Sequence, residues 1–441
     1  MVHRICLLLA FVPLPALTGV AMAQPATQTA AAVDGPAVAT EVKRLLNAQY
    51  VLPELRAKFA AVIDNGIAGG RYAVADANDL ATRLNEDLAT VSSDKHLGVM
   101  VDPERSKALA SAPVGMGADD APPTADAIRE SERKNHGLTR MEVLPGNIRY
   151  LEISSFAWAG ASSERAYDTA MAFLAGGDAV IIDVRPNGGG SPEAVRYAVS
   201  HFIAPNKPLM NFFMGGRGTE STTSLATTKA PRMVGKPLYV LSSNGSGSAA
   251  EEFLGHIAGY KLGDVIGERS AGAGFRNEFF PLPSGMIISI SVGRAVLAST
   301  GKDWEAVGIV PTVETAADKA LDVAKARALE RVAEQSEPGR KVQLKAIAAA
   351  LHAQVNPVKT ELPLAAYAGV YGERTVQIGD KGLTIRRGEH PVSPLIAVGP
   401  NRFAYVNDPA STVTFAVSAG RSNALHLVRA DGSEDRGKRA D

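Results

Sequence analysis

Two glycine-rich turns carry the residues most capable of chemistry. The first reads DVRPNGGGSPE over residues 183–193, and the second reads SSNGSGSAAEEF over residues 242–253. Each follows an apolar run typical of a buried strand and precedes a segment with helical spacing. In layered α/β proteins, ligands and catalytic groups gather at such strand-to-helix turns. The two turns are therefore the strongest candidates for a functional site.

Ser248, in the second turn, is the candidate nucleophile. It would stand at the N-terminus of the following helix, where free N–H groups and the helix dipole favour negative charge. A serine that attacks a carbonyl forms a tetrahedral oxyanion, which such a position stabilises. The alternative is structural, because Ser248 and Glu251 also have the spacing of a capping box, so that Ser248 would only cap the helix.

The first turn offers backbone donors. Gly188, Gly189 and Gly190 let a substrate approach closely and leave N–H groups free to point at an anion. A plain strand-to-helix turn would need the same glycines, so the spacing alone leaves both interpretations open.

Three other site types fit the second turn less well. A phosphate-binding P-loop needs a Gly-Lys-Ser/Thr ending, which is absent. The G-x-S-x-G nucleophile elbow fails because Asn244 and Ser248 stand where glycines are needed around Ser246. A dinucleotide fingerprint comes closer, but its first glycine, Gly245, follows the apolar strand by several residues.

A serine nucleophile needs a base, and His96 is the candidate. It lies in SSDKHLGVMV, between a predicted helix and an apolar strand, where active-site groups often occur. A solvated loop histidine is the alternative. We expect His136 and His390 to be solvated in polar segments, and His201 and His256 to pack within helices.

Composition narrows the possible partners and cofactors. Lys plus Arg and Asp plus Glu total 46 each, and this zero net charge argues against a general nucleic-acid binder. The single cysteine, Cys6, excludes a disulfide framework and a cysteine-based zinc site. No H-E-x-x-H or comparable metal pattern occurs, so we expect neither a metal nor another cofactor.

The N-terminus predicts export. Residues 1–23 have the form of a secretory signal peptide, with Arg4 before a short apolar core and a small-x-small cleavage site at 21–23. Cleavage after Ala23 would also remove Cys6. No later apolar run reaches 18 residues, so we expect no integral membrane span and a periplasmic or secreted protein.

The pattern along the chain predicts several units of an α/β protein. Three amphipathic helices are followed by a polar segment, then by alternating strands and helices, and finally by short alternating strands. The expected units are a signal peptide (1–23), a disordered leader (24–35), a helical bundle (36–100), a linker (101–145), an α/β core (146–336), a helical connector (337–361) and a small antiparallel β domain (362–441).

Taken together, these residues resemble the S41 peptidase family of tail-specific serine proteases, over about residues 40–335. The matching segments come in family order: DKHLGV, NIRYLEISSF, DVRPNGGG, SGSAAEEF, IGERSAGAG and DWEAVGIVPT. The resemblance implies a layered, crotonase-like α/β peptidase core. Members that process protein tails usually carry a PDZ domain between bundle and core, and the segment 102–145 is too short for one.

The resemblance also implies roles for single residues. The serine of the family motif Ser-Ala-x-Glu falls on Ser248, whereas Ala273 stands where one branch has a lysine base, so a Ser–Lys pair is not expected. The other branch, similar to tricorn core domains and the interphotoreceptor retinoid-binding protein, implies His96 as base and Glu305 as the group that orients it. A further serine of tricorn-type sites has no clear match.

The implied oxyanion donors are backbone N–H groups of Gly189 and Ala249. The implied function is an exported serine peptidase that hydrolyses unfolded or short peptides through an acyl-enzyme on Ser248. An alternative is a non-catalytic protein that binds peptide or lipid on the same scaffold, as the retinoid-binding relatives do. A dinucleotide enzyme is a more distant possibility.

Overall fold

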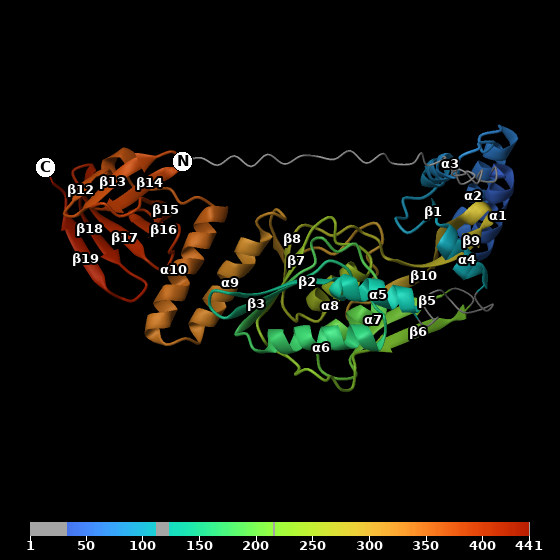
Figure 1. The fold of residues 1–441 in the computed structure, drawn as a ribbon, viewed down its shortest axis with the longest axis horizontal. Coiled ribbons are helices and arrows are strands. Elements are labelled where there is room, and N and C mark those ends of the chain that lie inside the picture. The colour runs from blue at the N-terminus through green and yellow to red at the C-terminus, as the bar shows by residue number, and fades with distance from the viewer. Residues whose placement is uncertain (1–32, 112–122, 215–216, 441) are drawn as a thin grey trace, which may run out of the picture.

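The computed structural model describes residues 33–111, 123–214 and 217–440. The predicted signal peptide, with Cys6, lies outside the described residues. The described chain is elongated, with the N-terminal helices at one end, the α/β layers in the middle and an antiparallel β domain at the other end (Figure 1). Among the described helices, none is both long and apolar enough to cross a membrane.

The N-terminal helices form where the apolar spacing predicts them. Asp34 caps the first helix by accepting the N–H of Ala37 (3.0 Å), and Asp76 caps the third by accepting the N–H of Asp79 (2.9 Å). Pro53 opens the second helix, where its missing N–H is tolerated. These helices are α1 (Gly35–Gln49), α2 (Pro53–Ala68) and α3 (Ala77–Ala89).

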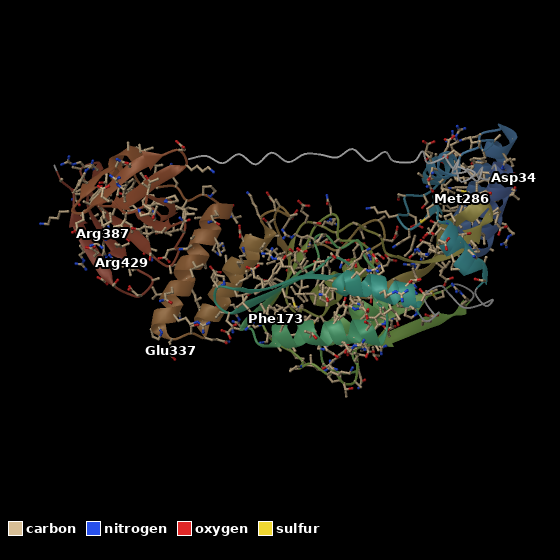
Figure 2. The ribbon with its side chains drawn as sticks, viewed as in Figure 1. Asp34, Phe173, Met286, Glu337, Arg387 and Arg429 are labelled. Atoms are coloured by element: carbon tan, nitrogen blue, oxygen red, sulfur yellow. The ribbon has the colours of Figure 1, made fainter. Side chains whose placement is uncertain are left out.

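The three helices share one hydrophobic core with an antiparallel sheet. Leu46 and Leu84 of the helices belong to the same buried cluster as Met286, which Figure 2 labels, and Ile288. The sheet has the order β1-β10-β5-β6, and β9 pairs with β10 outside this path. Its strands are β1 (Gly98–Val101), β5 (Pro208–Phe213), β6 (Thr219–Thr223), β9 (Phe275–Leu282) and β10 (Met286–Leu297).

A second, mainly parallel sheet forms the middle of the molecule. Its order is β11-β8-β7-β4-β3-β2, and only β2 runs antiparallel to its neighbour. All residues of β4 and β7 are buried, as expected for central strands covered on both faces. The strands are β2 (Leu138–Leu144), β3 (Ile148–Ile153), β4 (Ala179–Asp183), β7 (Leu238–Ser242), β8 (Asp264–Gly267) and β11 (Val313–Glu314).

Helices cover both faces of this sheet. Three of them share a core with one face: α6 (Ala161–Ala175), α7 (Pro192–Val199) and α8 (Ala249–Gly259). Two others share a core with the opposite face: α9 (Ala320–Glu334) and α10 (Pro338–Val355). Glu337, labelled in Figure 2, is the N-cap residue of α10 at the turn between the last two. The result is the layered α/β core that the sequence predicts.

The parallel pairing places the two glycine-rich turns side by side. β4 and β7 are neighbours, with Asp183 opposite Leu241. The turns begin at the carboxyl ends of these two strands and lead into α7 and α8. A second juxtaposition comes from the antiparallel sheet, where Gly98 pairs with Ser289 and so holds the start of β1 against β10.

The C-terminal domain is an eight-stranded antiparallel meander. Its strands pair in sequence order, and a bridge between Tyr371 and Arg439 joins the first strand to the end of the chain. A cluster of aromatic and aliphatic side chains fills its interior. The strands are β12 (Gly369–Tyr371), β13 (Arg374–Gly379), β14 (Gly382–Arg387), β15 (Ser393–Gly399), β16 (Arg402–Tyr405), β17 (Thr412–Ser418), β18 (Arg421–Val428) and β19 (Glu434–Lys438).

The segment expected to be an irregular linker contains more structure than its polar sequence indicates. It holds α4 (Pro103–Ser111), α5 (Ala125–Arg133) and the edge strand β2. α5 lies where the sequence predicts one short helix, near residues 124–135, although it buries none of its residues. β2 buries only Leu138 and Leu144, its two ends, and therefore looks polar.

Candidate active site

Ser248 occupies a strained position at the start of α8. Its backbone has φ 51° and ψ −120°, a conformation that residues with a side chain rarely adopt. Such strain persists only when the surroundings enforce it, and it is concentrated at functional sites. Here the neighbouring turn contributes, because a Cβ added to Gly189 would lie 2.8 Å from the Cβ of Ser248.

The Ser248 hydroxyl contacts His96. The distance from Ser248 Oγ to His96 Nε2 is 3.0 Å, although 152 positions separate the two residues in the chain. His96 follows α3 in a short loop whose shape depends on Asp94, because Asp94 Oδ1 accepts the backbone N–H of His96 at 2.9 Å. Lys95 donates from its side chain to the carbonyl of Ala271, which fastens this loop to the segment after β8.

The environment of His96 favours the neutral imidazole. Burial lowers its pKa below the ordinary 6.5, and the charge of Arg276 acts in the same direction. The carboxylates of Asp94 and Glu251 oppose that shift. A neutral ring keeps a lone pair on Nε2, which can accept the proton of the serine hydroxyl.

Glu251 organises the start of α8 from a fully buried position. Its carboxylate accepts the N–H of Ser248 (2.9 Å), of Gly272 (2.6 Å) and of Ala273 (2.8 Å), and also the hydroxyl of Ser270 (2.7 Å). Hydrogen bonds to an ionised acceptor are the strong ones. The sequence pattern predicts Glu251 only as half of a capping box, and three of these four donors come from a distant segment.

Asn187 joins the two glycine-rich turns. Its backbone carbonyl accepts the N–H of Gly247 at 3.0 Å, and its side chain donates to the carbonyl of Ile153 at 3.0 Å. Its Oδ1 accepts the N–H of Gly189 at 2.9 Å. The donor that the resemblance assigns to the oxyanion is thus already bonded, and it would have to turn away from Asn187 to meet a substrate oxygen. Ala249 N–H stands at the first position of α8.

Glu305 lies near the carboxylates of Asp94 and Glu251, and its own carboxylate accepts hydrogen bonds from backbone N–H groups. Its Oε2 accepts the N–H of Gly274 at 2.6 Å and of Phe275 at 3.1 Å. Burial raises its pKa to about 7, with further contributions from the charges of Asp94 and Glu251. Among the described residues, His96 Nδ1 is buried and has no hydrogen-bond partner. The structure thus brings Ser248 and His96 together, and it does not place the carboxylate of Glu305 in a hydrogen bond with His96.

A cavity of about 240 Å³ opens beside Ser248. Its walls mix apolar and polar groups, and Trp304 is fixed in one of them by donating its indole N–H to the carbonyl of Ala273 at 3.0 Å. Glu252 and Arg276 add charged groups. The lining residues are Gly190, Pro192, Phe212, Ser248, Ala249, Glu252, Ala273, Phe275, Arg276, Asn277, Phe279, Ala295 and Trp304.

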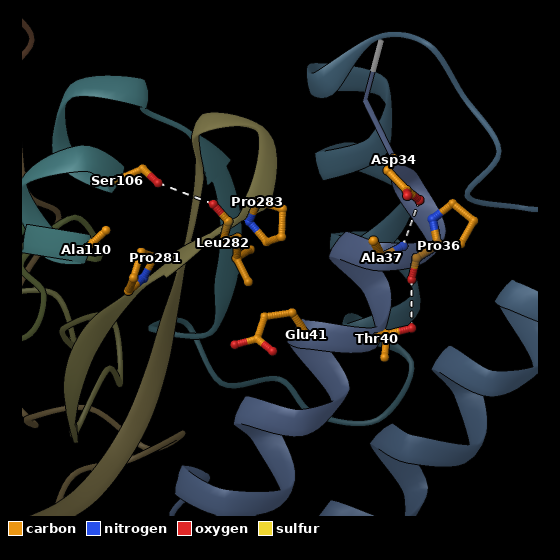
Figure 3. A pocket seen from close by; sticks show the side chains of 10 residues that line it. All are labelled: Asp34, Pro36, Ala37, Thr40, Glu41, Ser106, Ala110, Pro281, Leu282 and Pro283. Carbon is orange, nitrogen blue, oxygen red and sulfur yellow. Dashed lines mark hydrogen bonds between the residues drawn. The ribbon is translucent and has the colours of Figure 1, made fainter. Parts of the chain in front are cut away.

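A larger but open groove of about 710 Å³ lies elsewhere, between the start of α1, α4 and the end of β9. Figure 3 shows Thr40 and Glu41 on one side, and Ser106, which donates to the carbonyl of Leu282, on the other. The groove shares no lining residue with the cavity at Ser248. Although it is larger, this groove is therefore separate from the site around Ser248.

The other histidines lie apart from Ser248. The expectation that His136 is solvated is wrong, because its side chain is buried and its Nδ1 lies 2.9 Å from the hydroxyl of Ser163. His201 and His256 are fully buried, as packing residues would be. In the described part of the chain, no group of three or more His, Cys, Asp or Glu side chains is arranged to hold a metal ion.

Two protein-family models match this chain. A model described as peptidase family S41 matches residues 147–315, which include both glycine-rich turns and Glu305. A model described as the N-terminal domain of Peptidase_S41 in eukaryotic IRBP matches residues 23–136, which include His96. The chain belongs to peptidase family S41.

Two curated relatives illustrate how distant the family members are. The carboxy-terminal processing protease CtpB of Bacillus subtilis (strain 168) is 27% identical over 136 residues, which are 31% of this chain and 27% of the relative. The chloroplastic carboxyl-terminal-processing peptidase 2 of Arabidopsis thaliana is 28% identical over 198 residues, 42% of this chain and 36% of the relative. The chain thus spans about a third of the length of these family members.

Among solved structures, similarity is partial. The photosystem II D1 C-terminal processing protease is 16% identical, with 65% of this chain and 94% of that chain covered and a TM-score of 0.42. A lipoprotein from Streptococcus agalactiae is 15% identical, with 64% and 92% covered and a TM-score of 0.47.

Proposed function

We propose that this chain is a serine peptidase that hydrolyses peptide bonds in unfolded or short peptides through an acyl-enzyme on Ser248. The observation that carries the proposal is the 3.0 Å contact between Ser248 Oγ and His96 Nε2 at the N-terminus of α8. A helix cap has no need of a histidine on its hydroxyl, whereas a nucleophile needs a base within hydrogen-bond reach. This contact therefore favours catalysis over the purely structural interpretation of Ser248.

In the proposed reaction, His96 takes the hydroxyl proton while Ser248 Oγ attacks the substrate carbonyl. His96 then returns the proton to the leaving amine, and water hydrolyses the ester. Ala249 N–H and a donor from the 188–190 turn, with Gly189 as the first candidate, would hold the oxyanion. The family resemblance adds Glu305 to Ser248 and His96 as a third catalytic residue, which would orient His96.

The cavity beside Ser248 supports an extended substrate. Its volume of about 240 Å³ suits one side chain at a time, and its lining offers that side chain both aromatic and polar contacts. A peptide bond reaches Ser248 only if the side chain next to it enters the cavity, which a side chain packed inside a folded substrate cannot do. Unfolded or short peptides meet that condition, and compact domains do not.

A fluorophosphonate probe tests the proposal directly, since it forms a covalent bond only with an activated serine. We expect the wild type to become labelled and to cleave a denatured protein such as reduced casein, and Ser248→Ala and His96→Ala to do neither. Asn244→Ala, at an exposed position of the same turn, is the control. An unlabelled wild type, or undiminished labelling of Ser248→Ala, would contradict the proposal. Binding of peptide or lipid without any cleavage would instead support the non-catalytic alternative.

We also propose, from the sequence of residues 1–23, that the protein is exported to the periplasm or secreted. The segment lies outside the described residues, so the proposal rests on its charge and apolar pattern alone. N-terminal sequencing of the protein recovered after expression in a bacterial host tests it. We expect the mature chain to begin at Gln24, and a chain that retains Arg4 in the cytoplasm would contradict the proposal.

A further inference from the structure

Two buried polar atoms at the proposed catalytic pair have no hydrogen-bond partner among the described residues. One is Nδ1 of His96 and the other is Oδ2 of Asp94, two positions earlier in the chain. Buried polar atoms are almost always hydrogen-bonded, and an exception needs an explanation. When Nε2 accepts the proton of Ser248 Oγ, the neutral ring carries its own proton on Nδ1. The structure therefore holds an unsatisfied donor and an unsatisfied carboxylate oxygen in one short loop.

Two other carboxylates near His96 accept hydrogen bonds, Glu251 on both oxygens and Glu305 on one. Glu251 receives four hydrogen bonds, from Ser248, Ser270, Gly272 and Ala273, and has no oxygen left for the ring. Glu305 receives two backbone N–H groups on one oxygen. Asp94 is 8% exposed, and its Oδ1 accepts the backbone N–H of His96, while the hydroxyl of Tyr50 also interacts with its carboxylate.

The electrostatics agree with this geometry. The charged groups that act on the pKa of His96 are Asp94 from its own loop, Glu251 from α8 and Arg276 from β9. Asp94 is the strongest of the groups that raise it. Glu305, across the site, has its own pKa raised to about 7, so that much of it is protonated and neutral near pH 7. Tyr50, at the end of α1, also faces Asp94 and Glu305, and its raised pKa keeps it neutral.

We propose that Asp94 is a positioning residue whose spare carboxylate oxygen holds the Nδ1–H of His96, while Glu305 mainly holds the backbone of Gly274 and Phe275. This assignment rests on the proposed function and deepens it, because it names the charge that stabilises the imidazolium. The two atoms are not hydrogen-bonded in this structure, so the Asp94 carboxylate or the ring must turn for the bond to form. Catalytic hydrogen bonds are often long without substrate and tighten in the complex.

Asp94→Asn and Glu305→Gln form a matched pair of isosteric variants. In Asp94→Asn the amide oxygen would still accept the N–H of His96, so the loop should keep its shape. The NH₂ group of the new amide, however, would face Nδ1 as a donor and favour the wrong tautomer. We expect kcat for a peptide substrate to fall by about 100-fold or more in Asp94→Asn with little change in KM, and by less than about tenfold in Glu305→Gln.

The pH profile separates positioning from mere loop structure. The charge of Asp94 raises the pKa of His96, so its removal should shift the acid limb of kcat/KM to lower pH. Glu305→Gln should leave that limb nearly in place. Equal profiles for Asp94→Asn and wild type, or the larger loss of kcat in Glu305→Gln, would overturn the proposal. Asp94→Glu should recover part of the lost rate.

An NMR titration of histidine ring signals gives a second readout that needs no turnover. His96→Gln identifies the His96 signal, and thermal melting confirms that each variant is folded. We expect the pKa of His96 to fall in Asp94→Asn and to stay within experimental error in Glu305→Gln. A chain that neither labels nor hydrolyses would refute the proposed function, and an unchanged His96 pKa in Asp94→Asn would independently refute the role of Asp94.

Discussion

At the scale of single residues, the site depends on two backbone conformations that most side chains avoid. Ser248 has φ 51° and Gly189 has φ 125°. The two lie against each other, so that the glycine leaves room for the serine side chain. The strained conformation of Ser248 is thus permitted by Gly189 and held by the hydrogen bond from Ser248 N–H to Glu251.

Gly189→Ala tests this mutual dependence. The new Cβ would lie 2.8 Å from Ser248 Cβ, on a backbone that disfavours any side chain, so the serine must move. We expect fluorophosphonate labelling to slow by about 100-fold, since misplacement by about 1 Å has such effects. Gly188→Ala is the control, because a Cβ there meets no atom within 4 Å. Equal loss in both variants would argue against steric coupling between the two turns.

Glu305 should make stability depend on pH. Its pKa is raised from 4.5 to about 7, so the folded state holds a proton that the unfolded state releases. Its contribution to the free energy of unfolding is present below about pH 4.5 and is lost as pH rises through about 7. The loss is at most about 3 kcal/mol, and less because the side chain is partly exposed.

Urea unfolding of wild type and Glu305→Gln, compared at about pH 5 and about pH 8, measures this loss. The glutamine can still accept both N–H groups but cannot ionise, so we expect the variant to gain stability relative to wild type at the higher pH. A difference that does not vary with pH would contradict the raised pKa of Glu305.

At the scale of elements, the sequence predicts many of the apolar or capped parts of the fold, but it misses the apolar strands β5 and β15. β3 and β4 lie at the expected positions, and α8 begins one residue after Ser248. β19 is not predicted, because it reads Glu-Asp-Arg-Gly-Lys and only Gly437 in it is buried. β6, a polar edge strand of the antiparallel sheet, escapes prediction for the same reason.

In the site, too, some features can be predicted from the sequence and others cannot. Ser248 is predictable from its turn, whereas its contact with His96 joins positions 152 apart and depends on the pairing of β1 with β10. The role of Asn187 cannot be read from the sequence either, because its partners Ile153 and Gly247 belong to other elements.

Asn187→Ala tests how far the two glycine-rich turns act as one unit. The change removes the side-chain bonds to Ile153 and Gly189 and leaves two buried backbone groups unsatisfied, which costs about 1–3 kcal/mol each. We expect a lower melting temperature together with slower labelling of Ser248. Asn244→Ala, at an exposed position of the second turn, should change neither. Unchanged labelling in Asn187→Ala would mean that the turns are positioned independently.

At the scale of the whole molecule, the proposed site joins two cores. Ser248 starts a helix of the mainly parallel sheet's layer, and His96 follows the helices that pack on the antiparallel sheet. The C-terminal β domain has a separate core that shares no residue with the other three. Arg387 and Arg429, labelled in Figure 2, line a cavity of about 290 Å³ in that domain, apart from Ser248.

This division predicts two calorimetric transitions. Separate cores allow separate unfolding, so the β domain and the α/β body should melt independently and depart from two-state behaviour. A fluorophosphonate adduct on Ser248 should raise only the transition of the α/β body, because a group that binds only the folded site stabilises only the unit that contains it. The body should also melt as one unit, since the contact between His96 and Ser248 connects its two cores. A single transition that shifts as a whole would show instead that α10, whose Gln343 donates to the carbonyl of Ala430, couples the β domain to the body.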